Sequence, residues 1–356
     1  MLDLTILSDT MQSDAEKTVE KTRQALLTAI ARGRPFPTSP PEVRSAKQPT
    51  PAPVLAVLEG LQLEELEYCA DPDAQSPSQS WVPLRVVSDP AFAGGAPRPC
   101  AILLHPGHNS KDIMAKLQAK YAGRGYVAVA IDARYHGVRE DPELHYQDAL
   151  VRAWKDGIEH PFLLDTVWDC IRLLDYLETR DDIDTKRIGV TGYSLGGMHS
   201  WLLAAADTRI AAAAPMGGVQ NFSHALENNL YQARVDSILK VFQAAAEDAG
   251  ASAITKEVVQ SVWQRLLPGM LESYDAPASL SATAPRPLLV ITGEEDPRCP
   301  LPGLVIAMEQ ARGVYASLGA PEALEFYAQS GNGHGELTAE QLMKLREFMD
   351  RMLLRK

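Results

Sequence analysis

The sequence has little of what marks a disulfide-stapled or membrane-spanning protein. Its 356 residues include only four cysteines, which lie far apart, form no C-x-x-C pair and lack the spacing of a zinc site. We therefore expect reduced thiols and no metal centre. No apolar run approaches the roughly 20 residues that cross a bilayer, so no membrane span is predicted.

Positive charge is also scarce. Lys and Arg number 34 against 46 Asp and Glu, which gives a formal net charge of −12. Nucleic acids and anionic membrane surfaces attract clustered Lys and Arg, so we expect neither as a partner. The first residues show no basic segment followed by an apolar stretch, which favours a cytoplasmic location.

The length of the chain favours one large α/β domain that carries insertions. Val19, Leu26 and Ile30 recur at helical spacing within residues 13–32, and Ser13 is the candidate cap of an amphipathic helix there. Closely spaced prolines follow, which favour an extended connector. We assign residues 1–60 to this helix and connector, and residues 61–356 to the main domain.

From about residue 60, apolar runs alternate with helical patterns, which is typical of a mostly parallel sheet flanked by helices. Buried parallel strands read as nearly continuous apolar segments. Such segments are found at 100–107, 126–134, 187–194, 210–218 and 286–296, with a weaker one from 323. The runs LEELEYCADP and WVPLRVVSDP before them are expected to form an antiparallel edge hairpin or meander.

Residues 219–283 interrupt this alternation. They contain helical patterns and no strand-like run, and they lie between two of the strong strand predictions. We interpret them as a helical lid insertion. The alternative is an ordinary helical excursion that covers the sheet without touching a substrate.

The strongest local motif is G-Y-S-L-G-G at 192–197, with Ser194 at its centre. An apolar strand runs into it and a helix rich in small residues leaves it, which predicts a sharp turn that exposes the serine hydroxyl above the sheet. Gly192 and Gly196 remove side chains that would collide in so tight a turn. The N–H of Leu195, at the start of the helix, is the first candidate donor to an oxyanion.

A serine nucleophile requires a base and usually a carboxylate. Asp296 ends the strand-like run at 286–296, and His334 follows the last predicted strand in the loop S-G-N-G-H-G-E. Glu294 and Glu295 are competing candidates for the acid. The other seven histidines all precede Asp296, so the order serine, acid, histidine favours His334 as the base.

The second oxyanion donor should come from the loop L-L-H-P-G-H-N-S after the first strong strand. The backbone N–H of His108 is our candidate, with Gly107 as the alternative. His105, His108 and His136 could suggest a metal site, but no carboxylate or cysteine completes a ligand pattern near them.

Residues 98–354 resemble the α/β-hydrolases through these motifs taken together. The resemblance is greatest to the branch that contains dienelactone-hydrolase-like proteins, acetyl xylan esterases and prolyl-oligopeptidase-type catalytic domains. The segments D-x-R-x-H-G at 132–137, D-T-V-W-D at 165–169 and G-x-x-D-P-R-x-P at 293–300 also resemble a group of plant and algal α/β-hydrolases. The resemblance implies an α/β-hydrolase fold, with the turn at 132–137 bracing loops.

Dienelactone hydrolases use a cysteine nucleophile, so Ser194 implies esterase or peptidase chemistry instead. We predict a serine hydrolase that cleaves small to medium carboxylic esters without a cofactor. A prolyl-oligopeptidase-type peptidase and a binding protein without catalytic activity are the alternatives. No motif specifies the acyl group, the alcohol or the oligomeric state.

Overall fold

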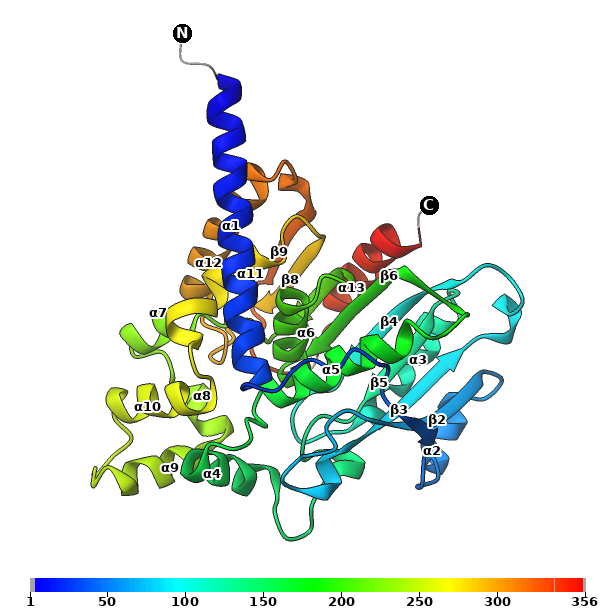
Figure 1. Cartoon of the computed structure of the whole chain (residues 1–356), viewed down its shortest axis with the longest axis horizontal. Coiled ribbons are helices and arrows are strands. Elements are labelled where there is room, and N and C mark those ends of the chain that lie inside the picture. The colour runs from blue at the N-terminus through cyan, green and yellow to red at the C-terminus, as the bar shows by residue number, and fades with distance from the viewer. Residues whose placement is uncertain (1–3, 336, 355–356) are drawn as a thin grey trace.

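The computed structural model describes residues 4–335 and 337–354, with side chains from residue 13 onward. Its centre is one nine-stranded sheet in the order β1-β2-β3-β5-β4-β6-β7-β8-β9 (Figure 1). The strands are β1 (Val43–Ser45), β2 (Gln62–Cys69), β3 (Trp81–Ser88), β4 (Arg98–Leu104), β5 (Val127–Ile131), β6 (Ile183–Tyr193), β7 (Ile210–Met216), β8 (Leu288–Gly293) and β9 (Leu324–Gln329).

The sheet is mostly parallel. Strands β5, β4, β6, β7, β8 and β9 pair in parallel, whereas β1, β2 and β3 form an antiparallel edge that joins β5. The predicted fold class and all six predicted strands are therefore confirmed, as is the hairpin β2–β3. Strand β1 was not predicted, and it lies in the segment that we interpreted as an extended connector.

Helices cover both faces of the sheet (Figure 1). The helices are α1 (Leu4–Ala31), α2 (Ala52–Val57), α3 (Ala115–Ala122), α4 (Tyr146–Asp156), α5 (Leu164–Leu177), α6 (Leu195–Ala206), α7 (Phe222–Glu227), α8 (Gln232–Ser237), α9 (Leu239–Asp248), α10 (Lys256–Leu266), α11 (Ala276–Ala282), α12 (Leu301–Ser317) and α13 (Ala339–Leu353). Within the part of the chain described, no helix combines the length and the apolar character that crossing a bilayer requires.

Alternate residues of the central strands point to opposite faces and form two cores. Ile102 and Val129 face the larger core, with α1, α5, α6, α11 and α12, whereas Leu103 and Ala130 face α3 and α13. Each buried Leu, Ile or Val contributes roughly 1.5–3 kcal/mol relative to exposure. The strands are thus fixed on both sides, and their carboxyl ends are held in place.

The N-terminal helix packs against α5, α6, α11 and α12, with Leu26 and Ile30 fully buried. It begins at Leu4, so the prediction that Ser13 caps its start is wrong, because the helical hydrogen bonding extends further toward the N-terminus. Arg32 forms a 2.6 Å ion pair with the buried Asp165 at the head of α5. The helix is therefore tied to the main domain by charge as well as by apolar packing.

Residues 219–283 are helical, as predicted, and contain α7 to α11. Helix α9 packs against α4 and α10, and Trp263 of α10 stacks on Phe162 with ring centroids 5.8 Å apart. The insertion thus builds a layer beside α4 on the larger-core side of the sheet (Figure 1). Its role as a lid stays a prediction.

Candidate active site

Ser194 lies in the sharp turn between β6 and α6. Its backbone has φ 54° and ψ −114°, a conformation that a residue with a side chain rarely adopts. The Ser194 N–H donates to the carbonyl of Met216 over 2.9 Å, which anchors the turn to the neighbouring strand β7. The side chain is nearly buried, with 8% of the residue exposed.

The two glycines that flank this turn have no room for a side chain. A Cβ on Gly196 would lie 2.1 Å from the carbonyl oxygen of Leu104, and one on Gly192 would lie 2.5 Å from the backbone of Gly196. The end of β4 therefore presses directly on the first turn of α6. This close approach is the physical reason for the spacing of the glycines around Ser194.

The structure brings together the three side chains that the sequence predicted. Ser194 Oγ lies 2.9 Å from His334 Nε2, and His334 Nδ1 lies 2.7 Å from Asp296 Oδ2. Both distances are within hydrogen-bonding range for proton transfer. The serine, the histidine and the carboxylate thus form one chain of hydrogen bonds, with each residue in a loop or turn beyond the carboxyl end of a parallel strand.

The carboxylate is oriented by its own loop. Asp296 Oδ1 accepts hydrogen bonds from the backbone N–H groups of Arg298 at 2.8 Å and Cys299 at 3.2 Å, which leaves Oδ2 for the histidine. Asp296 is buried, whereas the competing Glu294 and Glu295 are exposed. Of the three acidic residues, only Asp296 makes a hydrogen bond to His334.

Tyr193, inside the G-Y-S-L-G-G motif, holds the histidine loop, a contact that the sequence analysis missed. Its ring stacks on His334 with centroids 5.6 Å apart, and its hydroxyl donates to the Gly335 carbonyl. Burial raises the pKa of the Tyr193 hydroxyl to about 12, so the group remains a donor at neutral pH. No sequence pattern indicated this contact, because it joins residues far apart in the chain.

A buried arginine supports the acid loop from the helical insertion. Arg234 of α8 donates to the Arg298 carbonyl over 3.2 Å and lies 3.8 Å from the Cys299 sulfur. Burial raises the pKa of the Cys299 thiol well above its ordinary value, so the sulfur is held in its protonated form. The insertion therefore contacts the site through the loop behind Asp296.

The loop of Gly107 and His108 lies close to the start of α6, directly after the nucleophile. Within the described chain, no group accepts a hydrogen bond from the N–H of Leu195 or of His108. His108 has φ 60°, and a Cβ on Gly107 would lie 3.9 Å from the Leu195 side chain, so the loop passes over the start of α6. Gly107 lines the cavity beside Ser194 and remains the alternative donor.

The loop that carries Gly107 and His108 is braced by the turn after β5. Asp132 accepts hydrogen bonds from the Lys111 backbone N–H at 2.6 Å and from its ammonium group at 3.3 Å. His105 Nε2 accepts from the Ala133 N–H at 3.0 Å. This agrees with the expectation that the turn at 132–137 braces loops.

The histidines near this loop are buried and neutral. His105 donates through Nδ1 to the Pro106 carbonyl, and His136 donates through Nδ1 to the Arg134 carbonyl. Burial lowers the pKa of His136 to about 3 and lowers that of His105 as well. Among residues 4–335 and 337–354, no three His, Cys, Asp or Glu side chains are grouped so as to hold a metal ion.

A cavity of about 700 Å³ opens beside Ser194 and His334. Its walls come from the loop after β4, from α3, and from the loop and helix that follow His334, and include Met114, Leu117 and Leu342. Its lining contains no residue of 219–283. A substrate therefore has access to the serine from the side of the sheet that carries α3 and α13.

The chain belongs to the alpha/beta hydrolase family, whose profile matches residues 101–338. Among curated proteins, YtaP of Bacillus subtilis is 26% identical over 170 residues, which are 48% of each chain. The hydrolase ORFZ of Pyricularia oryzae is 28% identical over 142 residues, which are 37% of this chain and 33% of that protein. The aligned regions span about half or less of these curated relatives.

Solved esterases share the fold. Acetyl xylan esterase 1 from Thermoanaerobacterium sp. superposes with a TM-score of 0.62 at 15% identity, over 93% of each chain. The acetyl xylan esterase from Paenibacillus sp. R4 has a TM-score of 0.62 at 17% identity, over 97% of this chain and 94% of that one. A glucuronoyl esterase from Solibacter usitatus gives 0.56 at 15% identity, over 93% and 91%.

Proposed function

We propose that this protein hydrolyses carboxylic esters through an acyl-enzyme, with Ser194 as the nucleophile, His334 as the base and Asp296 as the group that orients the histidine. The observation that carries the proposal is the hydrogen-bonded chain from Ser194 Oγ to Asp296 Oδ2 at the open cavity. The esterase structures that share the fold support an ester as the substrate.

In the first half-reaction, Ser194 Oγ attacks the ester carbonyl carbon while its proton passes to His334 Nε2. The alcohol then leaves with that proton, and the acyl group remains bonded to the serine oxygen. In the second half-reaction, water gives a proton to the same nitrogen as it attacks the acyl carbon. The carboxylic acid is released and the serine recovers its proton.

The negative charge on the carbonyl oxygen needs donors that are already in place. The unpaired N–H groups of Leu195 and His108 fit this role, with the N-terminal end of α6 adding a favourable dipole. Loss of one such donor typically costs about 10² to 10³ in kcat. The bracing of the loop by Asp132 fits this need for a fixed geometry.

The experiment is hydrolysis of p-nitrophenyl esters from acetate to decanoate by the wild type and by Ser194→Ala. We expect turnover in the wild type and loss of at least about 10³-fold in the variant, because no other group is placed to attack. An intact-mass measurement should detect the acyl adduct in the wild type alone. Comparable turnover by Ser194→Ala would contradict the proposal.

A further inference from the structure

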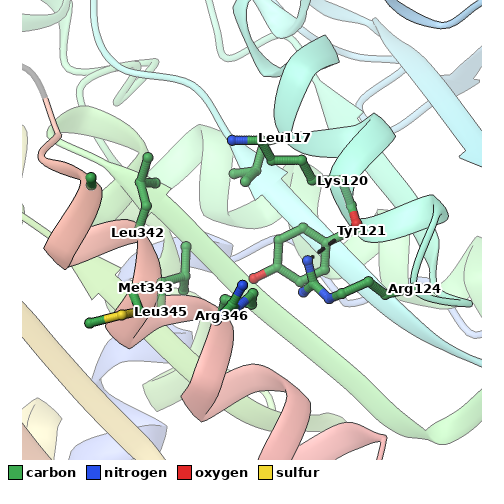
Figure 2. Close-up of a pocket in the computed structure, with 9 residues that line it drawn as sticks. Leu117, Lys120, Tyr121, Arg124, Leu342, Met343, Leu345 and Arg346 are labelled. Atoms are coloured by element: carbon green, nitrogen blue, oxygen red, sulfur yellow. Dashed lines mark hydrogen bonds between the residues drawn. The ribbon is translucent and has the colours of Figure 1, made fainter.

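The cavity beside Ser194 continues into a second one between α3 and α13. The second cavity has a volume of about 500 Å³ and shares Leu117, Lys120 and Leu342 with the first. Figure 2 shows Leu117 and Lys120 on α3 facing Leu342 and Arg346 on α13 across it. The two cavities therefore form one trough that leads away from the nucleophile.

Among the described residues, every charged side chain that lines this trough is cationic. They are Lys116, Lys120 and Arg298 in the first cavity, and Lys120, Arg124 and Arg346 in the second. Neither lining includes a carboxylate among the residues described. The chain has a formal net charge of −12, so this cluster of cations has the opposite sign to the net charge of the protein.

Among the residues that the structure describes, most of these cations have no ion-pair partner. Arg124 is engaged, because it donates to Asp350 at 3.0 Å and lies over the Tyr121 ring. No described carboxylate pairs with Lys116, Lys120, Arg298 or Arg346. We call these four residues the cationic trough. Cations gathered along one hollow without a paired carboxylate attract a complementary anion.

The positive stretch has a defined extent. Lys116 and Lys120 are one helical turn apart on α3, about 6 Å along the axis, and Arg346 lies on the opposite wall (Figure 2). Arg346 also lines a neighbouring hollow together with Glu347 and Asp350, so carboxylates are present at this end of the stretch. Its other end lies at Arg298, two residues from Asp296.

The trough also has apolar surface between the charges. Leu117, Tyr121, Leu342 and Leu345 line it, and Met343 beside them is 42% exposed. A ligand that fits has an apolar spacer of some length followed by an anionic group. A short neutral ester such as an acetate of a small alcohol has no anionic group for these cations to bind.

We propose that the preferred substrates are esters in which one arm is extended and carries an anionic group, bound by the cationic trough while Ser194 attacks the carbonyl. The anion is a carboxylate, sulfate or phosphate, which share the same charge complementarity. This inference rests on the ester hydrolysis proposed above and adds a substrate class to it. Because the cations are exposed, each contact should contribute about twofold to fivefold in affinity.

The test compares matched esters that differ only in the terminal charge. For the acyl arm, the pair is p-nitrophenyl hexanoate and the mono-p-nitrophenyl ester of adipic acid. For the alcohol arm, the pair is hexyl acetate and the acetate ester of 6-hydroxyhexanoate. We expect kcat/KM to be about tenfold higher for the anionic member in at least one pair. The difference should come from a lower KM, because the trough acts on binding. The preference should decline as NaCl is raised, since salt screens exposed charges.

The variant that tests the trough is Lys120→Met with Arg346→Met, both at exposed positions. We expect the ratio of kcat/KM for the anionic ester to kcat/KM for the neutral ester to fall about tenfold. A variant with glutamate at both positions should favour the neutral ester. Lys344→Met is the control, because Lys344 lies on the same helix but contacts Tyr327 outside the trough, and the ratio should be unchanged.

The two proposals fail in different ways. If neither member of any pair is hydrolysed, or if Ser194→Ala retains activity, then ester hydrolysis itself is wrong. If both members are hydrolysed equally, or if the ratio is the same in the wild type and in the Lys120→Met, Arg346→Met variant, then the cationic trough does not select the substrate although the esterase proposal stands.

Discussion

Replacing Asp296 with asparagine tests the proposed mechanism at its least obvious residue. Asp296 Oδ1 accepts from the N–H groups of Arg298 and Cys299. In the variant only the amide oxygen can fill that position, because an amide nitrogen does not accept hydrogen bonds. The NH₂ group of the asparagine must then point at His334 Nδ1.

That orientation reverses the roles of the two ring nitrogens of His334. Nδ1 has to accept the hydrogen bond, so the proton moves to Nε2, which can no longer take the proton of Ser194. A histidine fixed in the wrong tautomer lowers kcat by about 10⁴, which corresponds to about 5 kcal/mol of transition-state stabilisation. The shape of the site changes little, because Asn and Asp are nearly isosteric.

The assay is the initial rate with p-nitrophenyl acetate, with circular dichroism to confirm folding. The matched controls are Glu294→Gln and Glu295→Gln, which alter adjacent exposed carboxylates that make no hydrogen bond to His334. We expect each control to keep at least half of the wild-type kcat. A loss below tenfold in Asp296→Asn, or an equal loss in either control, would refute the assignment of the acid.

Two further predictions concern stability. Gly196→Ala should lower the free energy of unfolding by about 3 kcal/mol, since its Cβ would lie 2.1 Å from the Leu104 carbonyl oxygen. The control is Gly313→Ala on α12, which has open space around it and should be neutral or stabilising. Equal urea midpoints for the two variants would contradict the predicted clash at Gly196. Burial lowers the pKa of His136 and of His199 to about 3, so the unfolded chain binds protons first, from about pH 6.5 downward. The free energy of unfolding should therefore be highest above pH 6.5 and fall toward pH 3 by about 1.4 kcal/mol per pH unit for each histidine. In urea titrations at several pH values, His199→Gln should lose less stability per pH unit than the wild type. An unchanged dependence on pH would count against a neutral buried His199.

The elements that the sequence predicted well are those that depend on local constraints. The five strong strands lie between two helical layers, so each reads as a continuous apolar run. The turn around Ser194 needs glycine at two positions because the end of β4 presses on α6. Both signals are contained within a few residues of the chain, and both were recognisable without knowing the fold.

The elements that it missed depend on pairing between distant segments. Strand β1 has only three residues and exists because it pairs with β2. Arg234 reads as an ordinary surface residue of a helical segment, and only the fold places it behind Cys299. The cap prediction at Ser13 was wrong because the helix continues beyond that residue to Leu4.

The reacting groups of the proposed site are held by hydrogen bonds, whereas the cationic trough is open to solvent. We expect the first to determine the chemistry and the second to determine which ester binds. Asp296 and the loop of His108 are held by buried hydrogen bonds to Cys299 and Asp132, so the reacting groups have little freedom. Three residues of the cationic trough, in contrast, are exposed side chains on α3 and α13, namely Lys116, Lys120 and Arg346. Substitutions of these three residues can change which ester binds without moving the hydrogen-bonded chain that ends at Ser194. If the proposals hold, charge-altering variants of the trough should shift KM between substrates, whereas changes around Asp296 should act on kcat for every substrate alike.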